Sequence, residues 1–319
     1  MQRLTRRGED ERGAVAVVVA LVMVPLIAFA AISIDVAAMH AERQQLQTGA
    51  DAAVLAIAQD CVRGSAACAT RAQTAQALAV PNSNDAAPTA TITAFDPVLG
   101  RATVDNRGTS EHVFAPVIGQ GDSAVVSARS SAGWGYPSGG TAVLPLALSY
   151  CEWRSQTGGG TPSGTTARTI YLSGTSGAVT PCPGPSGNVP GGFGWLKTDG
   201  ANCHATSIIL QTLLTDTGVS VSSGCTPEDF IALHNATVLL PIFDRTTGTG
   251  SSATYRVYGY AAFKLTGYSF NGSYKWNAPC SGDARCIRGY FTEFVDQSDA
   301  FDYNMTAPKL GAAVISLTQ

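Results

Sequence analysis

The sequence has few charged residues and lacks the short motifs that carry most enzyme chemistry. Only 13 % of its 319 residues are Asp, Glu, Lys or Arg, and the formal net charge is −3. The sequence has no basic patch of the kind that binds nucleic acid, so we expect no nucleic-acid partner. There is no G-x-S-x-G nucleophile elbow and no G-x-x-x-x-G-K phosphate loop. A Ser/His/Asp triad, whose members converge only in space, would escape this test.

The sequence also lacks the paired ligands of a zinc site. It has eight cysteines but no C-x-x-C, and Cys203–His204 is the one adjacent Cys/His pair. An acidic cluster, DQSDAFDYN, contains Asp296, Asp299 and Asp302. We interpret it as a solvated loop, with weak calcium binding as the alternative. We therefore expect no metal and no other cofactor.

A long apolar run follows a basic head. Residues 14–34, AVAVVVALVMVPLIAFAAISI, carry no charge, and arginines occupy positions 3, 6, 7 and 12. At about 1.5 Å per residue the run is about 30 Å long as a helix, enough to cross a bilayer. A cleaved signal peptide, cut near 28–30, is the alternative, but its apolar part is usually only about 7–15 residues long. We expect a retained single-pass helix in the cell membrane, with the lipid bilayer as a partner.

The positive charges give this helix a direction. Four arginines precede the run, and within about 15 residues after it only Arg43 follows. Residues 1–13 should then be a cytoplasmic tail and the C-terminal part should be extracytoplasmic.

The cysteines support the same topology, because all of them lie beyond the apolar run. An even number confined to an exported part suggests disulfides. Cys61/Cys68 and Cys280/Cys286 are the natural local bridges, which leaves four cysteines to pair among themselves, with sequential pairing as one arrangement. The eight candidates are Cys61, Cys68, Cys151, Cys182, Cys203, Cys225, Cys280 and Cys286.

The apolar run continues into a helical, amphipathic segment. Residues 35–59 are rich in Ala, Gln, Glu and Leu, and no proline separates them from the run. Apolar residues recur every three to four positions, which predicts a single helix over about 14–59. They are Val36, Met39, Leu46, Ala50, Ala53, Val54 and Ile57. This face should pack on the ectodomain or on a partner helix.

The rest of the chain divides by composition. A second helix over 66–80 completes an extracytoplasmic helical segment, 35–80, and ends at turn residues 81–85. Residues 81–135 predict a small α+β unit of strand, strand, helix (111–118) and strand, and YPSGG at 136–140 suggests a linker. Residues 141–319 predict a Cys-rich, β-rich extracytoplasmic domain with helices over 208–214 and 226–233. The fold class is α+β: a long transmembrane and amphipathic helix, the small α+β unit, and a loop-rich, disulfide-stapled β-rich domain.

The segment 11–59 contains an R-G entry (12–13), an exit aspartate (35) and the helix R-x-x-L-Q-x-x-A-D-A-A-x-L-A (43–56). It resembles the N-terminal module of TadG-like proteins of the Tad/Flp pilus-assembly system. Gly49 replaces an alanine of the family pattern, and Val54 departs from its A-A-L step. More loosely, the later cysteines and Gly-Phe-Gly-Trp at 192–195 are similar to members of the actinobacterial type.

The resemblance implies a membrane-anchored accessory component of a pilus or secretion apparatus, not an enzyme, that contacts pilus-assembly or pseudopilin-like proteins. Pseudopilin-like relatives have a glycine followed, five residues on, by a glutamate within the span. Here Gly13 is present but Val18 occupies the fifth position. In those relatives the buried glutamate carboxylate needs a partner. The absence of this glutamate here argues against assembly as a major pilin. The candidate membrane or partner contacts are Asp35, Leu46, Gln47, Asp51, Ala53 and Leu55.

Three points remain open from the residues alone. Asp35 is either a charge that marks the membrane boundary, which we favour slightly, or a helix-packing or partner contact. The tryptophans at 134, 153, 195 and 276 are expected to fill a core, with a glycan or partner surface as the alternative. A cell-surface glycan or cell-wall binding protein is therefore the second function, and an anchored extracellular hydrolase the third.

Overall fold

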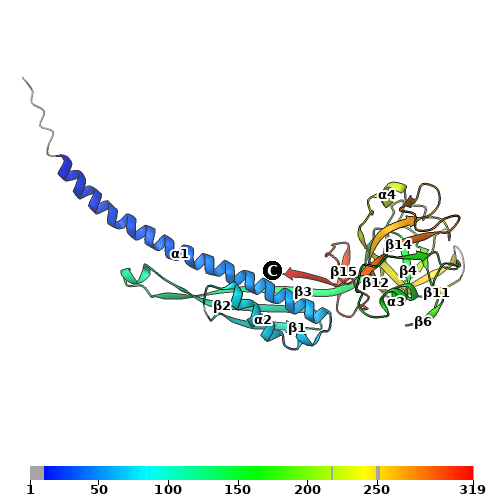
Figure 1. Cartoon of the computed structure of the whole chain (residues 1–319), viewed down its shortest axis with the longest axis horizontal. Coiled ribbons are helices and arrows are strands. Elements are labelled where there is room, and N and C mark those ends of the chain that lie inside the picture. Colours follow the sequence, from blue (N-terminus) through cyan, green and yellow to red (C-terminus); the bar gives the residue numbers. More distant parts are fainter. Residues whose placement is uncertain (1–10, 86, 217, 249–251, 319) are drawn as a thin grey trace, which may run out of the picture.

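The computed structural model describes residues 11–85, 87–216, 218–248 and 252–318. The molecule is elongated (Figure 1). A helix of 52 residues, α1 (Glu11–Val62), lies along a narrow sheet, and together they form a stalk. A β-rich head, residues 143–300, lies at the opposite end from the start of α1. The long helix, the β-rich part and the bridges confirm the predicted fold class.

The stalk sheet is antiparallel. Its strands are β1 (Thr89–Asp96), β2 (Arg101–Glu111), β3 (Ser123–Ala142) and the C-terminal β16 (Val314–Thr318). β3 lies between β2 and β16, which pairs with residues 131–135. Buried and exposed side chains alternate along β2 and β3, so one face packs on α1 and the other meets water.

The second half of α1 packs its apolar stripe on this sheet. Leu46, Ala50, Ala53, Val54 and Ile57 have no exposed surface. Ala53, Val54 and Ile57 pack against Ala102, Val104, Ala132 and Trp134 of the sheet, and Leu46 packs against Val126 and Ala128. The predicted continuous helix and its amphipathic face are thus present, and the chain covers this face with its own sheet. Val36, expected on the same face, remains 46 % exposed.

Short helical elements follow α1. They are the 3₁₀ turn η1 (Ala66–Cys68), the helix α2 (Arg71–Ala79) and the turn η2 (Val80–Asn82). α2 packs on α1 and β1, on the same side of the sheet as the long helix (Figure 1). The predicted helix over 111–118 is only a 3₁₀ turn, η3 (Ala115–Ile118). It caps a long β2–β3 hairpin.

The stretch expected as a linker, 136–140, is strand. β3 runs through it and joins the stalk to the head without a break. Residues 136–140 pair with β15 (Phe301–Asn304), and residues 139–142 pair with β9 (Ala205–Ile208). Pro and Gly suggested a loop, but distant strands supply the pairing. A Cβ at Gly140 would lie 2.3 Å from the Ala300 carbonyl oxygen, so glycine permits the close approach.

The helix predicted over 208–214 is also wrong. β9 ends at Ile208, Leu210 takes a left-handed conformation with φ of 68°, and β10 spans Thr212–Leu214. The helix predicted over 226–233 is confirmed as α4 (Pro227–Ile231), which begins with a capping box between Thr226 and Asp229.

The head contains an eight-stranded sheet with the helix α3 (Tyr150–Thr157) packed beside it. The strand order is β5-β14-β12-β11-β4-β8, and β10 and β13 also pair with β12. A separate β6–β7 hairpin completes the set. The bounds are β4 Leu146–Ser149, β5 Arg168–Tyr171, β6 Cys182–Gly184, β7 Gly187–Val189, β8 Phe193–Trp195, β11 Thr237–Thr247, β12 Thr254–Ser269, β13 Lys275–Trp276 and β14 Cys286–Thr292.

Aromatic side chains fill the head core. Trp195 and Phe193, from the Gly-Phe-Gly-Trp element, meet Phe230 and Phe270 edge to face, with ring centroids 4.9–6.2 Å apart. A Cβ at Gly194 would lie 2.1 Å from the Tyr255 hydroxyl, which explains the glycine between the two rings. The tryptophans at 134, 153 and 195 are at most 5 % exposed, as expected for core residues.

All eight cysteines are bridged, in sequential pairs. The four disulfides join Cys61 to Cys68, Cys151 to Cys182, Cys203 to Cys225 and Cys280 to Cys286. The expected framework, including both local bridges, is therefore confirmed. One bridge fixes the C-terminal end of α1, and the other three lie in the head.

Truncation of the buried stripe tests the stalk core. Ile57→Ala should lower the free energy of unfolding of the stalk by about 2–5 kcal/mol, because it removes a fully buried side chain and leaves a cavity. The measurement is the urea midpoint of the detergent-solubilised chain, followed by hydrogen exchange of stalk amides. The control is Val98→Ala at a site 71 % exposed, which should change stability by less than about 0.5 kcal/mol. Equal effects of both variants would contradict the packing of α1 on the sheet.

Candidate functional site on the long helix

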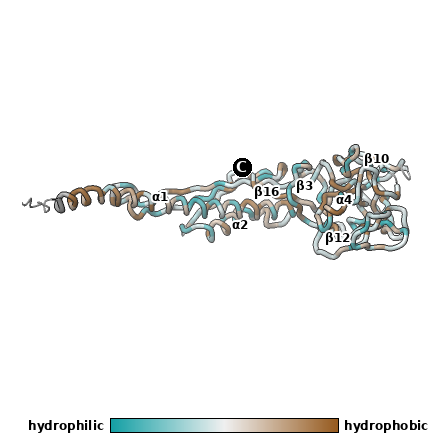
Figure 2. Tube along the Cα trace, turned by 90° about the horizontal axis from the view of Figure 1, so that it is seen from above, coloured by the Kyte–Doolittle hydropathy of each residue, from teal (hydrophilic) through white to brown (hydrophobic). Residues whose placement is uncertain are grey.

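The first half of α1 is apolar and uncovered. Over residues 15–34 most side chains stand free of the rest of the chain, and Leu21, Val24 and Phe29 are 69–70 % exposed. Figure 2 shows this half as a hydrophobic tube that projects away from the stalk sheet and the head. Among the residues described, α1 is the one helix long and apolar enough to cross a membrane, and its most apolar window is 0 % buried. Membrane anchoring fits such a surface, because water-exposed apolar area of this extent is costly.

Asp35, the residue directly after the apolar run, has a specific partner within the chain. Its side chain is only 5 % exposed. The carboxylate accepts hydrogen bonds from the backbone N–H groups of Val113 at 2.9 Å, Phe114 at 3.0 Å and Ala115 at 2.7 Å. These amides form the start of η3, at the tip of the β2–β3 hairpin. The interpretation of Asp35 as a simple boundary charge is therefore insufficient, since it ties the helix to the hairpin.

The environment of Asp35 favours the ionised carboxylate. Burial raises the pKa of this carboxyl, but the hydrogen bonds from Val113, Ala115 and Phe114, together with the nearby His112, outweigh burial and hold the pKa below its ordinary value. Three N–H donors on one carboxylate are a charge-assisted contact, which is stronger than a neutral one.

A second buried carboxylate, Glu42, lies two turns further along the same helix face. It is 3 % exposed, accepts the hydroxyl of Ser83 at 2.6 Å and accepts the backbone N–H of Asn84 at 3.2 Å. Sequence reasoning missed this residue. Its seven-residue spacing from Asp35, continued four residues later by Leu46, was the available signal for a shared helix face.

The other predicted contact residues lie along the packed half of α1. Leu46 and Ala53 have no exposed surface, and Leu55 is partly buried against the stalk core. Gln47 donates to Asp51 at 2.8 Å and to the Arg129 carbonyl oxygen at 3.2 Å. The structure thus brings Leu46, Gln47 and Ala53 against the stalk sheet of the same chain, and Asp35 against the hairpin tip.

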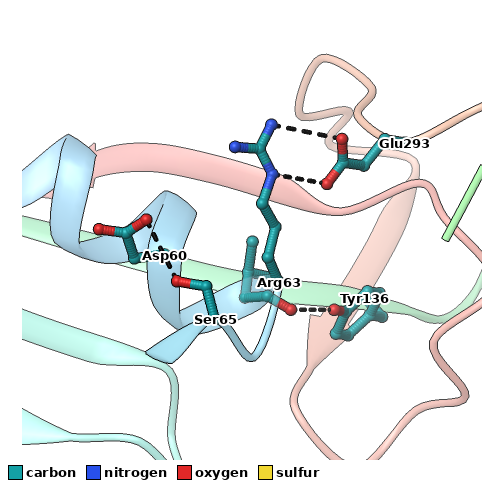
Figure 3. A network of polar contacts seen from close by, with 6 residues as sticks. Asp60, Arg63, Ser65, Tyr136 and Glu293 are labelled. Carbon is teal, nitrogen blue, oxygen red and sulfur yellow. Dashed lines mark hydrogen bonds and ion pairs between the residues drawn. The ribbon is translucent and has the colours of Figure 1, made fainter. Parts of the chain in front are cut away.

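The C-terminal end of α1 is tied to the head (Figure 3). Arg63 makes a bidentate ion pair with Glu293, with N···O distances of 2.7 and 3.3 Å. The Tyr136 hydroxyl donates to the carbonyl oxygen of Val62. Because Arg63 is 45 % exposed, the ion pair contributes at most about 1 kcal/mol. The buried Tyr136 contact adds a directional bond between the helix end and β3.

His234, a candidate base for a hydrolase, has other surroundings. The His234 ring stacks on Trp276 with centroids 4.1 Å apart, and its Nε2 lies 3.2 Å from the Tyr268 hydroxyl. Within the described ranges, no group of three or more His, Cys, Asp or Glu side chains is placed to hold a metal ion.

These features define a class of protein: one whose exposed apolar helix continues as the packed spine of its own stalk. Residues 13–60 match the model of the Tad family, described as "Putative Flp pilus-assembly TadE/G-like". This match confirms, for residues 13–60, the resemblance predicted from the helix motif. It ends at residue 60 and leaves the stalk sheet and the head outside. Neither the curated proteins nor the solved structures gave a match.

Removal of the Asp35 carboxylate should release the hairpin tip. In Asp35→Ala, the amides of residues 113–115 lose their acceptor, so their hydrogen exchange should become faster. Asp51→Ala is the matched control, because Asp51 lies on the same helix but accepts from the Gln47 side chain. Unchanged exchange at 113–115 in Asp35→Ala would contradict the contact.

The same contact should depend on pH with a defined sign. Because the folded pKa of Asp35 lies below the ordinary value of about 3.9, the contact is fully formed above that value and is lost as the pH falls through the folded pKa. Protection of the three amides, corrected for intrinsic exchange, should stay constant down to about pH 4 and then decrease. Asp35→Ala should show no such decrease.

Proposed function

We propose that this protein is a membrane-anchored accessory component of a Tad/Flp pilus-assembly or secretion system and acts through protein contacts rather than catalysis. In this proposal α1 crosses the membrane once, the tail 1–13 is cytoplasmic, and the stalk and head are extracytoplasmic. The family match to residues 13–60 supports a role related to pilus assembly, and the exposed apolar surface of α1 supports membrane anchoring.

One observation carries the proposal: α1 is unbroken from the apolar half to the half that packs in the stalk. A cleaved signal peptide would separate these two halves. As a retained helix, α1 holds the stalk and head rigidly on the membrane, because a helix without a loop has no hinge at the membrane surface. The arginines before the run and the disulfides beyond it support the proposed direction.

Partner contacts then fall on the side of α1 that the sheet leaves free. The buried stripe is already satisfied within the chain, so it is not available to a second helix. Positions 37, 41, 44 and 48 recur at helical spacing and are all exposed. With the apolar half of α1, they give one continuous surface for a pseudopilin-like helix, which would lie parallel to α1.

The two other functions have less support. A glycan-binding platform needs exposed aromatic rings, but three of the four tryptophans are buried and the fourth, Trp276, is stacked on His234. A hydrolase needs a nucleophile and a base in contact, whereas His234 meets tyrosine and tryptophan rings.

Cysteine labelling in intact cells tests the topology. All native cysteines are bridged, so an introduced thiol is the target for a membrane-impermeant maleimide. Val98→Cys, in the exposed β1–β2 turn, should label in intact cells, and Gln2→Cys should label only after lysis. The reverse pattern would overturn the orientation, and loss of the N-terminal tail from the mature protein would overturn the anchor.

Photocrosslinking in cells tests the partner surface. A benzoylphenylalanine at Gln44, on the free side of α1, should crosslink to another protein of the pilus-assembly system. The matched control is the same residue at Val98, which lies at the opposite end of the stalk sheet and should give no such adduct. Recovery of no assembly protein from Gln44, or equal adducts from both positions, would count against the proposal.

A further inference from the structure

We propose that the tip of the β2–β3 hairpin is a second membrane-contacting element, which dips into the lipid interface beside α1. The inference rests on the proposed anchoring by α1 and adds a contact that the anchor helix alone does not require. The hairpin tip would contact the boundary between the acyl chains and the headgroups of the bilayer around the span.

The tip is apolar and exposed. Residues 113–121, VFAPVIGQG, carry no charge, and Glu111 and His112 on one side and Asp122 on the other flank them. Val113 is 69 % exposed, Phe114 is 37 % exposed and Val117 is 82 % exposed. In a water-exposed loop such residues bury nothing, whereas at a membrane surface they leave water. The two flanking carboxylates would limit the depth of insertion, because charge is costly below the headgroups.

The position of the tip matches the end of the membrane span. Asp35 directly follows the last apolar residue of the run, Ile34, and bonds to the backbone of residues 113–115. These bonds fix the loop at the level where α1 would leave the hydrocarbon. In Figure 1 the hairpin extends from the stalk toward the N-terminal half of α1 and away from the head. A membrane placed by the span would therefore meet the tip as well.

The surface between the tip and α1 continues the apolar character. Val36 on the helix is 46 % exposed and Val125 on β3 is 74 % exposed, and both line a shallow groove with Met39. The groove also contains His40 and Arg43, whose polar ends can face lipid headgroups. The patch is thus apolar toward the span and basic at its edge, as an interfacial element would be.

Two contacts with the bilayer would have a mechanical effect. A single helix can tilt and rotate in the membrane, whereas a helix with a second membrane contact beside it, here the hairpin tip, has a preferred tilt and a preferred rotation about its axis. The hairpin tip would thus present the free side of α1 in one direction. Asp35 would join the hairpin tip to the end of the span.

Site-specific fluorescence in proteoliposomes tests the inference on the full chain. An environment-sensitive NBD probe is attached through Val117→Cys, with Val98→Cys as the matched control. Both positions are exposed valines at loop ends, 82 % and 71 % exposed. They lie at opposite ends of β2, which at about 3.3 Å per residue separates them by roughly 35 Å. Leu26→Cys, within the apolar run, reports on the anchor itself. Intact disulfides in each variant show that it has folded.

The expected result is blue-shifted emission at positions 26 and 117. Most of it should be lost at position 117 when the lipids carry doxyl quenchers near the headgroup boundary, and at position 26 when the doxyl groups lie deep in the acyl chains. Position 98 should keep a water-like spectrum and resist quenching. If position 26 is quenched while position 117 behaves like position 98, the hairpin tip does not contact the membrane, but anchoring by α1 is supported. If position 26 is also unquenched, the anchoring fails. If position 117 becomes protected only when an assembly protein is added, the tip is a protein-binding surface and the proposal is overturned.

Discussion

The structure depends on one constraint, which is that a single continuous helix must satisfy two different surroundings. Its first half keeps large apolar side chains free of the chain, and its second half buries an apolar stripe, from Leu46 to Ile57, against a sheet. Between them lies Asp35. Its carboxylate accepts hydrogen bonds from three backbone N–H groups of a hairpin that lies 78–80 residues further along the chain. The change from an uncovered apolar half to a half packed on the chain itself therefore occurs at a charged residue that has hydrogen-bond partners, so the helix passes this point without an unpaired buried charge.

Much of this arrangement could be read from local sequence, because local signals determine it. Hydropathy and helical spacing give the extent of α1, and the Thr226/Asp229 capping box marks α4. The local cysteine spacing gives two of the four bridges. Local composition failed at 136–140, which lies in β3, and at 208–214, where β9 ends and β10 forms. The strand partners, β15 for 136–140 and β12 for β10, lie far along the chain. Pairing with these distant strands overrides local composition, including the preference of Pro and Gly at 136–140 for loops.

The candidate site shows the same division. The sequence marked Asp35 and the stripe from Leu46 onward, yet it could not show what faces them, because the hairpin and the sheet come later in the chain. It also left Gly49 as a departure from the family pattern. The structure supplies a reason, since a Cβ at Gly49 would lie 3.0 Å from both the Asn106 amide nitrogen and the Asn82 Cβ. Asn106 donates to the Leu46 carbonyl oxygen, so the glycine makes room for a polar contact across the helix–sheet interface.

The placement of β16 has a consequence for how the chain folds. Strands β1 to β3 of the stalk precede the head in the chain, but the stalk sheet is completed by residues 314–318, which follow the head and pair with β3. Until these residues pair, one edge of β3 stays open, and an open edge can pair with other chains. Contacts across so long a sequence separation also form slowly. The head is therefore an insertion between β3 and β15, and the stalk sheet can close only when strands from both sides of the head are present.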